Sequence, residues 1–321
     1  MAADFKYSSI LESCTLCPYN CRTDRFKNNN GFCRASSVME ISCILPHFGE
    51  EPPISGTKGS GTIFFKHCNM RCVYCQNFQI SQENDKPFLK NDAMPNLDEC
   101  MLELQKRGCH NINLVSPTIW SAHIIDSLNS LRTKETGLDI PVIFNSGGYE
   151  NPDTIKMLEG FINIYMPDIR YSRNESAYKY SGIKNYVENN RRSLIEMYRQ
   201  VGGLKTDKNG IAISGLIIRL LILPGIAHEV TESLDFIRNE LSADVYISIM
   251  TQYKPLYKAL HYPEINRLIN QDEYNSIVDY AEKLGFYHGA FQEYEEIEKE
   301  KDLFVPDFNN KDIFKFRKEK R

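Results

Sequence analysis

Three cysteines lie in the stretch Cys68-Asn69-Met70-Arg71-Cys72-Val73-Tyr74-Cys75, and the fold and chemistry that we expect follow from their C-x3-C-x2-C spacing. The residues before it, Gly61–Lys66, form a Thr/Ile/Phe run after a Gly-Ser-Gly break, a pattern that predicts a buried strand. The three thiols are therefore expected in the loop at the carboxyl end of that strand. Barrels and open α/β sheets place their chemistry at this edge.

The number of thiols indicates the kind of metal centre. A structural zinc site takes four protein ligands, and the sequence has no fourth cysteine at short spacing here. A 4Fe–4S cluster also usually has four thiolate ligands, so three would leave one iron without a protein ligand. Such an iron binds a small molecule, which makes the cluster catalytic. The alternative is a reduced protein with three unrelated thiols, against which the spacing and the loop position argue.

Composition narrows the class of protein. The chain has 321 residues, of which 42% are hydrophobic and 25% are charged, as in ordinary soluble globular proteins. A net charge of −4 argues against a general nucleic-acid binder. Neither a long apolar run nor the apolar core of a signal peptide is evident, so we expect no membrane association. The ten cysteines are then metal ligands rather than disulfides, and the expected location is the cytoplasm.

A second group of cysteines lies near the N-terminus, and its members are Cys14, Cys17, Cys21 and Cys33. Four thiols this close together suit one tetrahedral metal ion or a second iron–sulfur cluster. The segment has few apolar residues, so a bound metal would take the place of a packed core. Zinc and iron–sulfur both remain open here, and free thiols are the alternative. Cys43 lies in an apolar run and is expected to be a core residue.

From residue 61 onward, expected strands alternate with helical patterns, which is typical of a parallel α/β arrangement. The expected strands are Gly61–Lys66, Asn111–Val115, Pro141–Asn145, Ile162–Met166, Ile213–Ile222 and Val245–Met250. Apolar stripes predict helices at Leu97–Arg107, around Leu194 to Val201, and around Tyr274 to Leu284. Six such units are too few for a full eight-stranded barrel.

Polar residues follow several of these strands. Ser116-Pro117-Thr118 follows the second strand, and Asn145-Ser146-Gly147-Gly148-Tyr149 ends the third. Glycine lets the backbone approach a ligand closely, and Ser, Thr and Asn supply hydrogen bonds without charge. Asp168 and Arg170 are two residues apart on the fourth strand and are expected on the same face.

Arg219 is the one charged residue in the apolar fifth strand. A buried arginine needs an anionic partner, and that partner is either Asp168 or a ligand carboxylate. The alternative to a binding role is a purely structural Arg–Asp pair.

As a set, these residues resemble the radical S-adenosylmethionine (radical SAM) superfamily, whose C-x3-C-x2-C loop follows the first barrel strand. Tyr74 matches the aromatic residue that is typical just before the third cysteine. Further blocks resemble one branch, the PflX-like group, which is named for its similarity to pyruvate formate-lyase-activating enzyme. These blocks are His47-Phe48-Gly49-Glu50-Glu51-Pro52, Ile54-Ser55-Gly56, Gly59–Phe65, Cys75-Gln76-Asn77, Ile80-Ser81-Gln82, Ser116-Pro117-Thr118 and Pro263-Glu264-Ile265-Asn266-Arg267.

The resemblance implies a partial (β/α)6 TIM-like barrel with an N-terminal Cys-rich metal-binding segment. It implies a 4Fe–4S cluster on Cys68, Cys72 and Cys75, with S-adenosylmethionine on the open iron. One electron from the reduced cluster would cleave the sulfonium to methionine and a 5′-deoxyadenosyl radical. That radical would abstract hydrogen from a small molecule or protein that the sequence does not identify, and the residues acting on this substrate are likewise unknown.

The resemblance also assigns individual residues. Group members carry N-terminal cysteines that match the four of this chain. Ser116-Pro117-Thr118 stands where other members use a Gly-Gly-Glu motif to hold the methionine amine. Asp168 and Arg170 fall where activases place an Asp-x-Lys that contacts the cofactor, and Arg219-Leu220 stands where the branch often has Arg-His. The residues expected to bind the cofactor are therefore Tyr74, Ser116, Thr118, Asn145, Asp168, Arg170 and Arg219.

The expected organisation is a Cys-rich segment and loop over residues 1–58, a core barrel over 59–290 and a charged extension over 291–321. The expected partners are a one-electron donor, such as flavodoxin or ferredoxin, and the substrate. An oxygen-sensitive radical SAM enzyme is the function predicted. The alternatives are an activase of a glycyl-radical enzyme, and a non-catalytic redox or scaffold protein that holds iron–sulfur or zinc.

Overall fold

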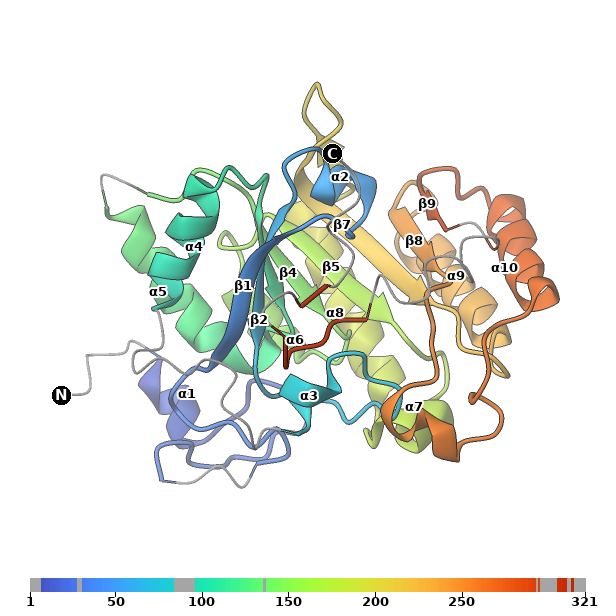
Figure 1. The fold of residues 1–321 in the computed structure, drawn as a ribbon, viewed down its shortest axis with the longest axis horizontal. Coiled ribbons are helices and arrows are strands. Elements are labelled where there is room, and N and C mark those ends of the chain that lie inside the picture. Colours follow the sequence, from blue (N-terminus) through green and yellow to red (C-terminus); the bar gives the residue numbers. More distant parts are fainter. Residues whose placement is uncertain are drawn as a thin grey trace. The chain divides into compact units, whose positions relative to one another are not determined.

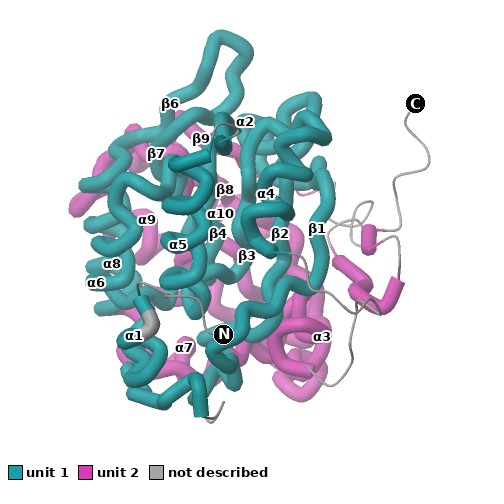
Figure 2. Tube along the Cα trace, turned by 90° about the vertical axis from the view of Figure 1, so that its left-hand side faces the viewer, with its two compact units in different colours: residues 1–70, 89–167, 188–216 teal, residues 71–88, 168–187, 217–321 magenta. Residues whose placement is uncertain are grey.

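The computed structural model describes residues 7–27, 31–83, 96–134, 137–292, 294, 305–310 and 313–314. Helices and strands alternate along the chain from the second strand onward (Figure 1). The chain forms two compact units, each assembled from segments that are distant in sequence (Figure 2). The first contains residues 1–70, 89–167 and 188–216, and the second contains residues 71–88, 168–187 and 217–321.

The first unit is built on a mostly parallel sheet. Strand β1 (Ile41–His47) pairs antiparallel with β2 (Ser60–Phe65). From β2 the sheet continues in parallel through β3 (Ile112–Val115), β4 (Val142–Ser146) and the start of β5 (Ile164–Ile169). Every residue of β2, β4 and β5 is buried, as in parallel strands that are covered on both faces.

Helices and short strands complete this unit. The helices are α1 (Ser8–Glu12), α2 (Pro52–Ser55), α4 (Leu97–Lys106), α5 (Ser121–Arg132), α6 (Pro152–Met157) and most of α8 (Tyr186–Val201). A 3-10 turn spans Thr118–Trp120. The two-residue strand β6 (Lys205–Thr206) pairs with the start of β7 (Ala212–Leu221). Leu97, Met101 and Leu104 of α4 are all fully buried, which confirms the apolar stripe expected there.

In the second unit, the end of β7 pairs in parallel with β8 (Tyr246–Met250), and β8 pairs in parallel with β9 (Gly289–Phe291). Its helices are α3 (Phe78–Ser81), α7 (Asn174–Ser181), α9 (His228–Glu240) and α10 (Gln271–Lys283), with a 3-10 turn at Tyr257–His261. Asn270 and Glu273 form a capping box that begins α10.

The α/β class and the parallel sheet are confirmed, and all the expected strands are present with their ends shifted by a few residues. The partial barrel itself stays a prediction. The sequence pattern does not predict β1. The strand contains Pro46, and most of its residues are only partly buried, so it has no continuous apolar run. Proline is tolerated on a sheet edge, where its missing N–H is not needed. Cys43 lies on this strand opposite Phe64, and the residue as a whole is partly exposed. Burial nevertheless raises the pKa of its thiol to about 12, so the sulfur lies in apolar packing as expected.

Parallel pairing brings the carboxyl ends of β3 and β4 to the same edge of the first unit's sheet. Val115 pairs with Asn145, and the Ser116 N–H donates to the Asn145 carbonyl at 2.9 Å. The loops that follow these strands therefore begin side by side. This is the edge where α/β sheets bind ligands.

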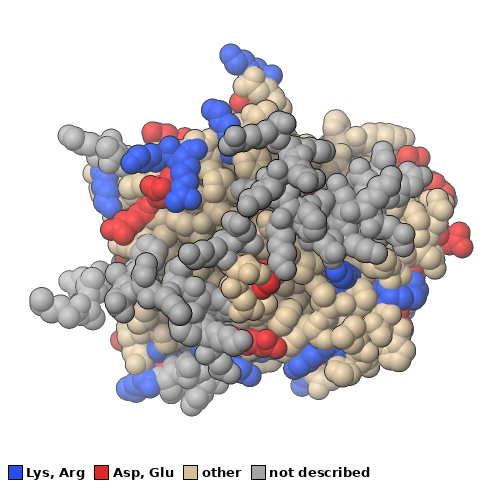
Figure 3. Space-filling view, viewed as in Figure 1, with Lys and Arg blue, Asp and Glu red and all other residues tan. Residues whose placement is uncertain are grey.

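Positive and negative side chains are interspersed on the face shown in Figure 3. Within the described ranges, no helix combines the length and apolar character needed to cross a membrane. The expected C-terminal extension is described only at residues 291–292, 294, 305–310 and 313–314, and its basic end at 315–321 lies outside the described residues. One described part packs against α3, because the Phe308 N–H donates to Gln79 Oε1 at 2.8 Å.

Candidate functional site

The candidate site is built on the loop that follows β2. His67 has a left-handed backbone with a φ of 68°, which turns the chain away from the sheet. Its Nε2 lies 2.6 Å from Glu40 Oε2, and this contact lowers the pKa of the Glu40 carboxyl. The Trp120 indole N–H donates to the Lys66 carbonyl at 3.1 Å. The start of the cysteine loop is therefore held by both a side-chain and a main-chain contact.

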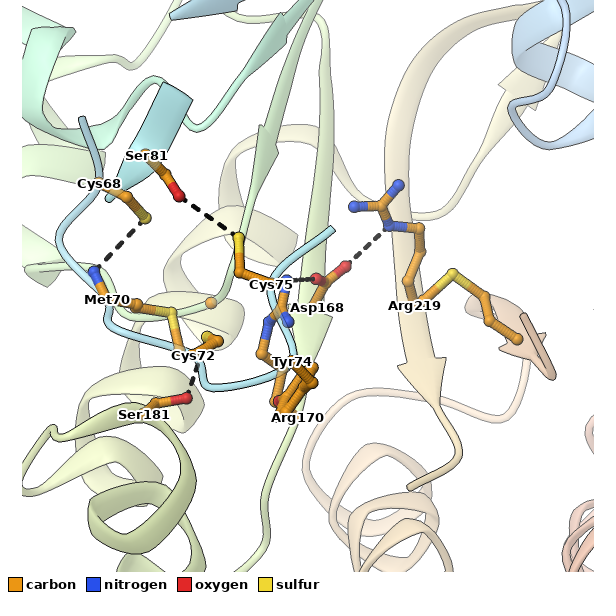
Figure 4. Close-up of polar contacts among 12 residues, drawn as sticks. Cys68, Met70, Cys72, Tyr74, Cys75, Ser81, Asp168, Arg170, Ser181 and Arg219 are labelled. Atoms are coloured by element: carbon orange, nitrogen blue, oxygen red, sulfur yellow. Dashed lines mark hydrogen bonds and ion pairs between the residues drawn. The ribbon is translucent and has the colours of Figure 1, made fainter. Parts of the chain in front are cut away.

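Each of the three cysteine sulfurs of this loop has a hydrogen-bond donor beside it (Figure 4). The Met70 N–H donates to Cys68 Sγ at 3.4 Å. The Ser181 hydroxyl donates to Cys72 Sγ at 3.0 Å. Cys75 Sγ lies 3.4 Å from Ser81 Oγ. A thiolate accepts hydrogen bonds and donates none, so these surroundings suit the charged form of the ligands.

Main-chain hydrogen bonds fix the part of the loop that belongs to the second unit. The Arg71 N–H donates to the Ser181 carbonyl at 3.0 Å, and the Val73 N–H donates to the Tyr180 carbonyl at 2.8 Å. The Val73 carbonyl in turn accepts from the Lys258 N–H at 2.9 Å. The end of α7 thus acts as a rigid support for this half of the loop.

Burial of Cys75 works against its charged form. Burial raises the pKa of the Cys75 thiol, and the neighbouring Cys72 raises it further, while Ser81 and Arg170 oppose the rise. A thiol with a raised pKa keeps its proton at neutral pH unless a cation takes the proton's place. Bound iron would supply that cation. Three thiols are the ligand type of an iron–sulfur cluster, although within the described residues their side chains are not arranged ready to hold a metal.

Asp168, at the end of β5, is the centre of a buried ion triad. Its Oδ1 accepts from Arg219 Nε at 2.8 Å and its Oδ2 accepts from Arg170 Nη2 at 2.6 Å (Figure 4). Asp168 is 3% exposed, so both contacts lie away from bulk water. Of the two partners left open for Arg219, the structure shows Asp168. One carboxylate thus bridges two guanidinium groups in this place.

Arg170 also borders Tyr74. Its guanidinium carbon lies 5.9 Å from the centre of the Tyr74 ring. Arg170 Nε has no hydrogen-bond partner among the described residues, although its pKa is held well above the usual range by Asp168 against the effect of burial. The backbone of Arg170 is fixed, since its N–H donates to the Tyr186 hydroxyl at 3.0 Å. Tyr74 and the ion triad therefore meet within the second unit, as expected for residues of one site.

In the first unit, Thr118 and Asn145 are buried and Ser116 is partly buried. Ser116 has a φ of 57°, which is uncommon for a residue with a side chain. Such backbone outliers are found at functional sites more often than elsewhere. The structure places these three residues together at the edge described above.

Glu150 was missed by the sequence reasoning, although it follows directly on the Asn145–Tyr149 loop. It is fully buried, and neither carboxyl oxygen has a hydrogen-bond partner in the part of the chain that the structure describes. Burial raises the pKa of Glu150 to about 7, while the hydroxyls of Thr118 and Ser146 oppose the rise. Ser146 Oγ also lacks a partner among these residues. An acidic residue directly after a Gly-Gly loop at a strand end is the signal that would have found it.

The N-terminal cysteines form a second cluster within the first unit. Cys14, Cys17 and Cys33 are buried and Cys21 is exposed. Burial raises the pKa of Cys17 well above its usual range, and the other three thiols raise it further because they lie near enough to interact with it. The four thiols therefore lie in one region, and their convergence on a single metal stays a prediction.

Arg25 anchors this segment to the 3-10 turn at Thr118–Trp120. Its Nη1 donates to the Ile119 carbonyl at 2.6 Å and its Nε to the Ser36 carbonyl at 2.9 Å. Its guanidinium carbon also lies 4.7 Å from the centre of the Trp120 ring. Across the described residues, no group of three or more His, Cys, Asp or Glu side chains has an arrangement ready to hold a metal ion.

Comparison with known proteins gives one clear sequence relative. No family model matches the chain. Over 281 residues the chain is 31% identical to MJ0674 of Methanocaldococcus jannaschii, a protein described as uncharacterized. The match covers 86% of this chain and 76% of that protein.

Solved structures overlap with the chain at lower similarity. Streptococcus suis SuiB bound to the precursor peptide SuiA is 11% identical, with a TM-score of 0.46 over 71% of this chain and 47% of that one. SuiB bound to S-adenosylmethionine is 9% identical, with a TM-score of 0.45 over 76% and 49%. HydG, a maturase of the FeFe-hydrogenase, is 12% identical, with a TM-score of 0.46 over 73% and 51%. The chain thus spans about half the length of these proteins, and overlaps of this size identify no reaction.

Proposed function

We propose that this chain, which belongs to the family of the Methanocaldococcus jannaschii protein MJ0674, is a radical SAM enzyme with a 4Fe–4S cluster on Cys68, Cys72 and Cys75. The observation that carries the proposal is the loop after β2, where each of the three sulfurs has a hydrogen-bond donor beside it. Three thiolates leave one iron open to a ligand. When bound with S-adenosylmethionine, the cluster supplies one electron that breaks the sulfur–C5′ bond, giving methionine and a 5′-deoxyadenosyl radical that takes hydrogen from the substrate.

The ion triad supports a role in binding the cofactor. Asp168 holds the guanidinium groups of both Arg170 and Arg219. A guanidinium group can bind a carboxylate such as that of the methionyl group. Tyr74, beside Arg170, lines the same place.

The buried carboxyl of Glu150 supports a second contact. It lies beside Thr118. Thr118 belongs to the Ser116-Pro117-Thr118 segment, which stands where other radical SAM proteins have a Gly-Gly-Glu motif for the methionine amine. We infer that Glu150 supplies the carboxylate that Ser116-Pro117-Thr118 lacks, with Asn145 bordering the same edge. Because an ammonium group binds the ionised carboxylate, Glu150→Gln is expected to weaken S-adenosylmethionine binding most strongly above about pH 7.

The finer parts of the proposal concern the branch, the partners and the second metal. We place the chain in the PflX-like branch, with a flavodoxin or ferredoxin as electron donor. We propose that Cys14, Cys17, Cys21 and Cys33 hold zinc or an iron–sulfur cluster with a structural or electron-relay role. Four thiolates complete either centre, so no position is left for a substrate. The substrate that loses hydrogen is either a small molecule or a glycine of a partner protein. A glycyl radical signal that appears on a partner protein would identify the second case.

The test is anaerobic reconstitution with iron and sulfide, followed by dithionite and S-adenosylmethionine. We expect a cluster in the wild type and formation of 5′-deoxyadenosine. Cys68→Ala, Cys72→Ala and Cys75→Ala should each lose both, whereas Cys43→Ser, which changes a cysteine outside the loop, should keep both. If the wild-type protein carries the full cluster but forms no 5′-deoxyadenosine, it is not a radical SAM enzyme. That result would favour the redox or scaffold alternative.

A further inference from the structure

A series of buried hydroxyl groups leads to the sulfur of Cys72. Tyr74 Oη lies 2.7 Å from Tyr171 Oη, and Tyr171 Oη lies 2.7 Å from Ser181 Oγ. Ser181 Oγ donates to Cys72 Sγ at 3.0 Å. All four residues belong to the second unit, and none is more than 5% exposed. The series connects the segment between β5 and α7, the end of α7 and the cysteine loop.

Counting protons fixes the direction of these hydrogen bonds. A cysteine that binds iron is a thiolate and can only accept. The single hydroxyl proton of Ser181 must therefore point to Cys72 Sγ, which leaves Ser181 Oγ to accept from Tyr171. Because Tyr171 donates its hydroxyl proton to Ser181 Oγ, its own oxygen accepts a hydrogen bond from Tyr74. Every proton of the series then points toward the sulfur.

We infer that Tyr74, Tyr171 and Ser181 act together as positioning residues that set the electron density on Cys72 and thereby the reduction potential of the cluster. Donors to a ligand sulfur withdraw electron density from it, which makes the cluster easier to reduce. Hydrogen bonds arranged in series polarise one another, so each hydroxyl strengthens the next. This inference rests on the proposed function, since it requires the cluster.

The surrounding contacts hold the series in place. The Tyr171 ring meets the Tyr186 ring edge to face, with centres 5.4 Å apart. The Tyr74 ring meets the Tyr253 ring in the same way at 5.8 Å. The Tyr253 hydroxyl, however, donates to the Ile265 carbonyl at 2.7 Å and takes no part in the series. Tyr253 therefore offers a matched control, because it is a buried tyrosine against the same ring.

The experiment measures the midpoint potential of the reconstituted cluster during anaerobic titration with dithionite, which adds one electron to each oxidised cluster. The reduced state is followed by electron paramagnetic resonance. We expect Ser181→Ala to shift the midpoint to a more negative potential, Tyr171→Phe to shift it less and Tyr74→Phe least. Tyr253→Phe should leave it unchanged. Pulsed resonance in deuterated buffer should also show an exchangeable deuteron near the cluster that Ser181→Ala removes.

The outcomes separate the inference from the proposed function. An unchanged midpoint in Ser181→Ala with the cluster intact overturns the inference alone, as does an equal shift in Tyr253→Phe. A wild-type protein that assembles no cluster overturns the proposed function and the inference together. If Ser181→Ala takes up too little iron to titrate, the ordered shifts of Tyr171→Phe and Tyr74→Phe decide, because both retain the ring and the Ser181 hydroxyl.

Discussion

Replacing Glu150 with Gln is expected to change the pH dependence of stability, because the native carboxyl is buried and its pKa is about 7 instead of the ordinary 4.5. Below pH 4.5 the group is protonated in both the folded and the unfolded chain and contributes nothing. Between 4.5 and 7 the unfolded chain ionises while the folded chain keeps its proton, so wild-type stability falls as the pH rises. Above pH 7 the carboxyl is ionised in both the folded and the unfolded chain, so the loss of stability no longer changes with pH. A difference of about 2.5 pKa units corresponds to about 3 kcal/mol.

Urea denaturation of the two proteins between about pH 4 and about pH 8 measures this effect. The informative quantity is the change in the stability difference with pH, since a buried amide adds a cost that does not vary with pH. We expect Glu150→Gln to gain about 3 kcal/mol relative to the wild type across this range. Glu240→Gln removes an exposed carboxylate at the end of α9 and should show no such gain. A stability difference for Glu150→Gln that is the same at every pH would show that the pKa of Glu150 is not raised in the folded protein.

Three further predictions concern other parts of the molecule. Asp168→Asn should cost about 3–5 kcal/mol in urea denaturation, because it leaves Arg170 and Arg219 without their shared buried carboxylate; a loss below about 1 kcal/mol would contradict a buried triad. Arg25→Met should cost about 2 kcal/mol through its lost bonds to the Ile119 and Ser36 carbonyls, measured in the same way, and a neutral effect would show that these bonds are dispensable. Changing both Cys14 and Cys17 to Ala should remove the N-terminal metal while iron at Cys68–Cys75 is at least partly retained; separate zinc and iron counts measure this, and complete loss of both metals would oppose two independent sites.

Elements with a strong local pattern could be predicted from the sequence. The fifth expected strand is an apolar run with one charge, and strand β7 is as expected. Arg219 bonds to Asp168, which is one of the two partners left open. A buried guanidinium has few acceptable partners, so the choice could be narrowed to these two.

Features that depend on long-range contacts could not be predicted. Ser181 and Cys72 are 109 residues apart, and Tyr171 and Tyr74 are 97 residues apart. Serine and tyrosine occur commonly on helices and strand ends, so no local signal marks these as neighbours of a metal ligand. The buried carboxyl of Glu150 could not be predicted for a related reason. Its burial follows from packing around the loop rather than from the residues beside it in the sequence. The spacing of the cysteines identifies the ligands, and only the fold identifies what surrounds them.

The two cysteine groups are joined by contacts within the first unit, and this explains why we expect only partial retention of iron when the N-terminal metal is lost. Phe32, next to Cys33, stacks on Tyr19 with ring centres 3.9 Å apart. Tyr19 meets the Tyr149 ring edge to face at 5.8 Å. The Tyr149 carbonyl accepts from Asn69 Nδ2 at 2.5 Å, directly beside the first ligand of the central loop. Loss of order around Cys33 would remove the ring contacts that hold Tyr149, and the Asn69 bond would weaken with them. The remaining supports of the loop, the Glu40 contact of His67 and the main-chain bonds to α7, do not involve the N-terminal metal, so assembly should become less efficient without being abolished.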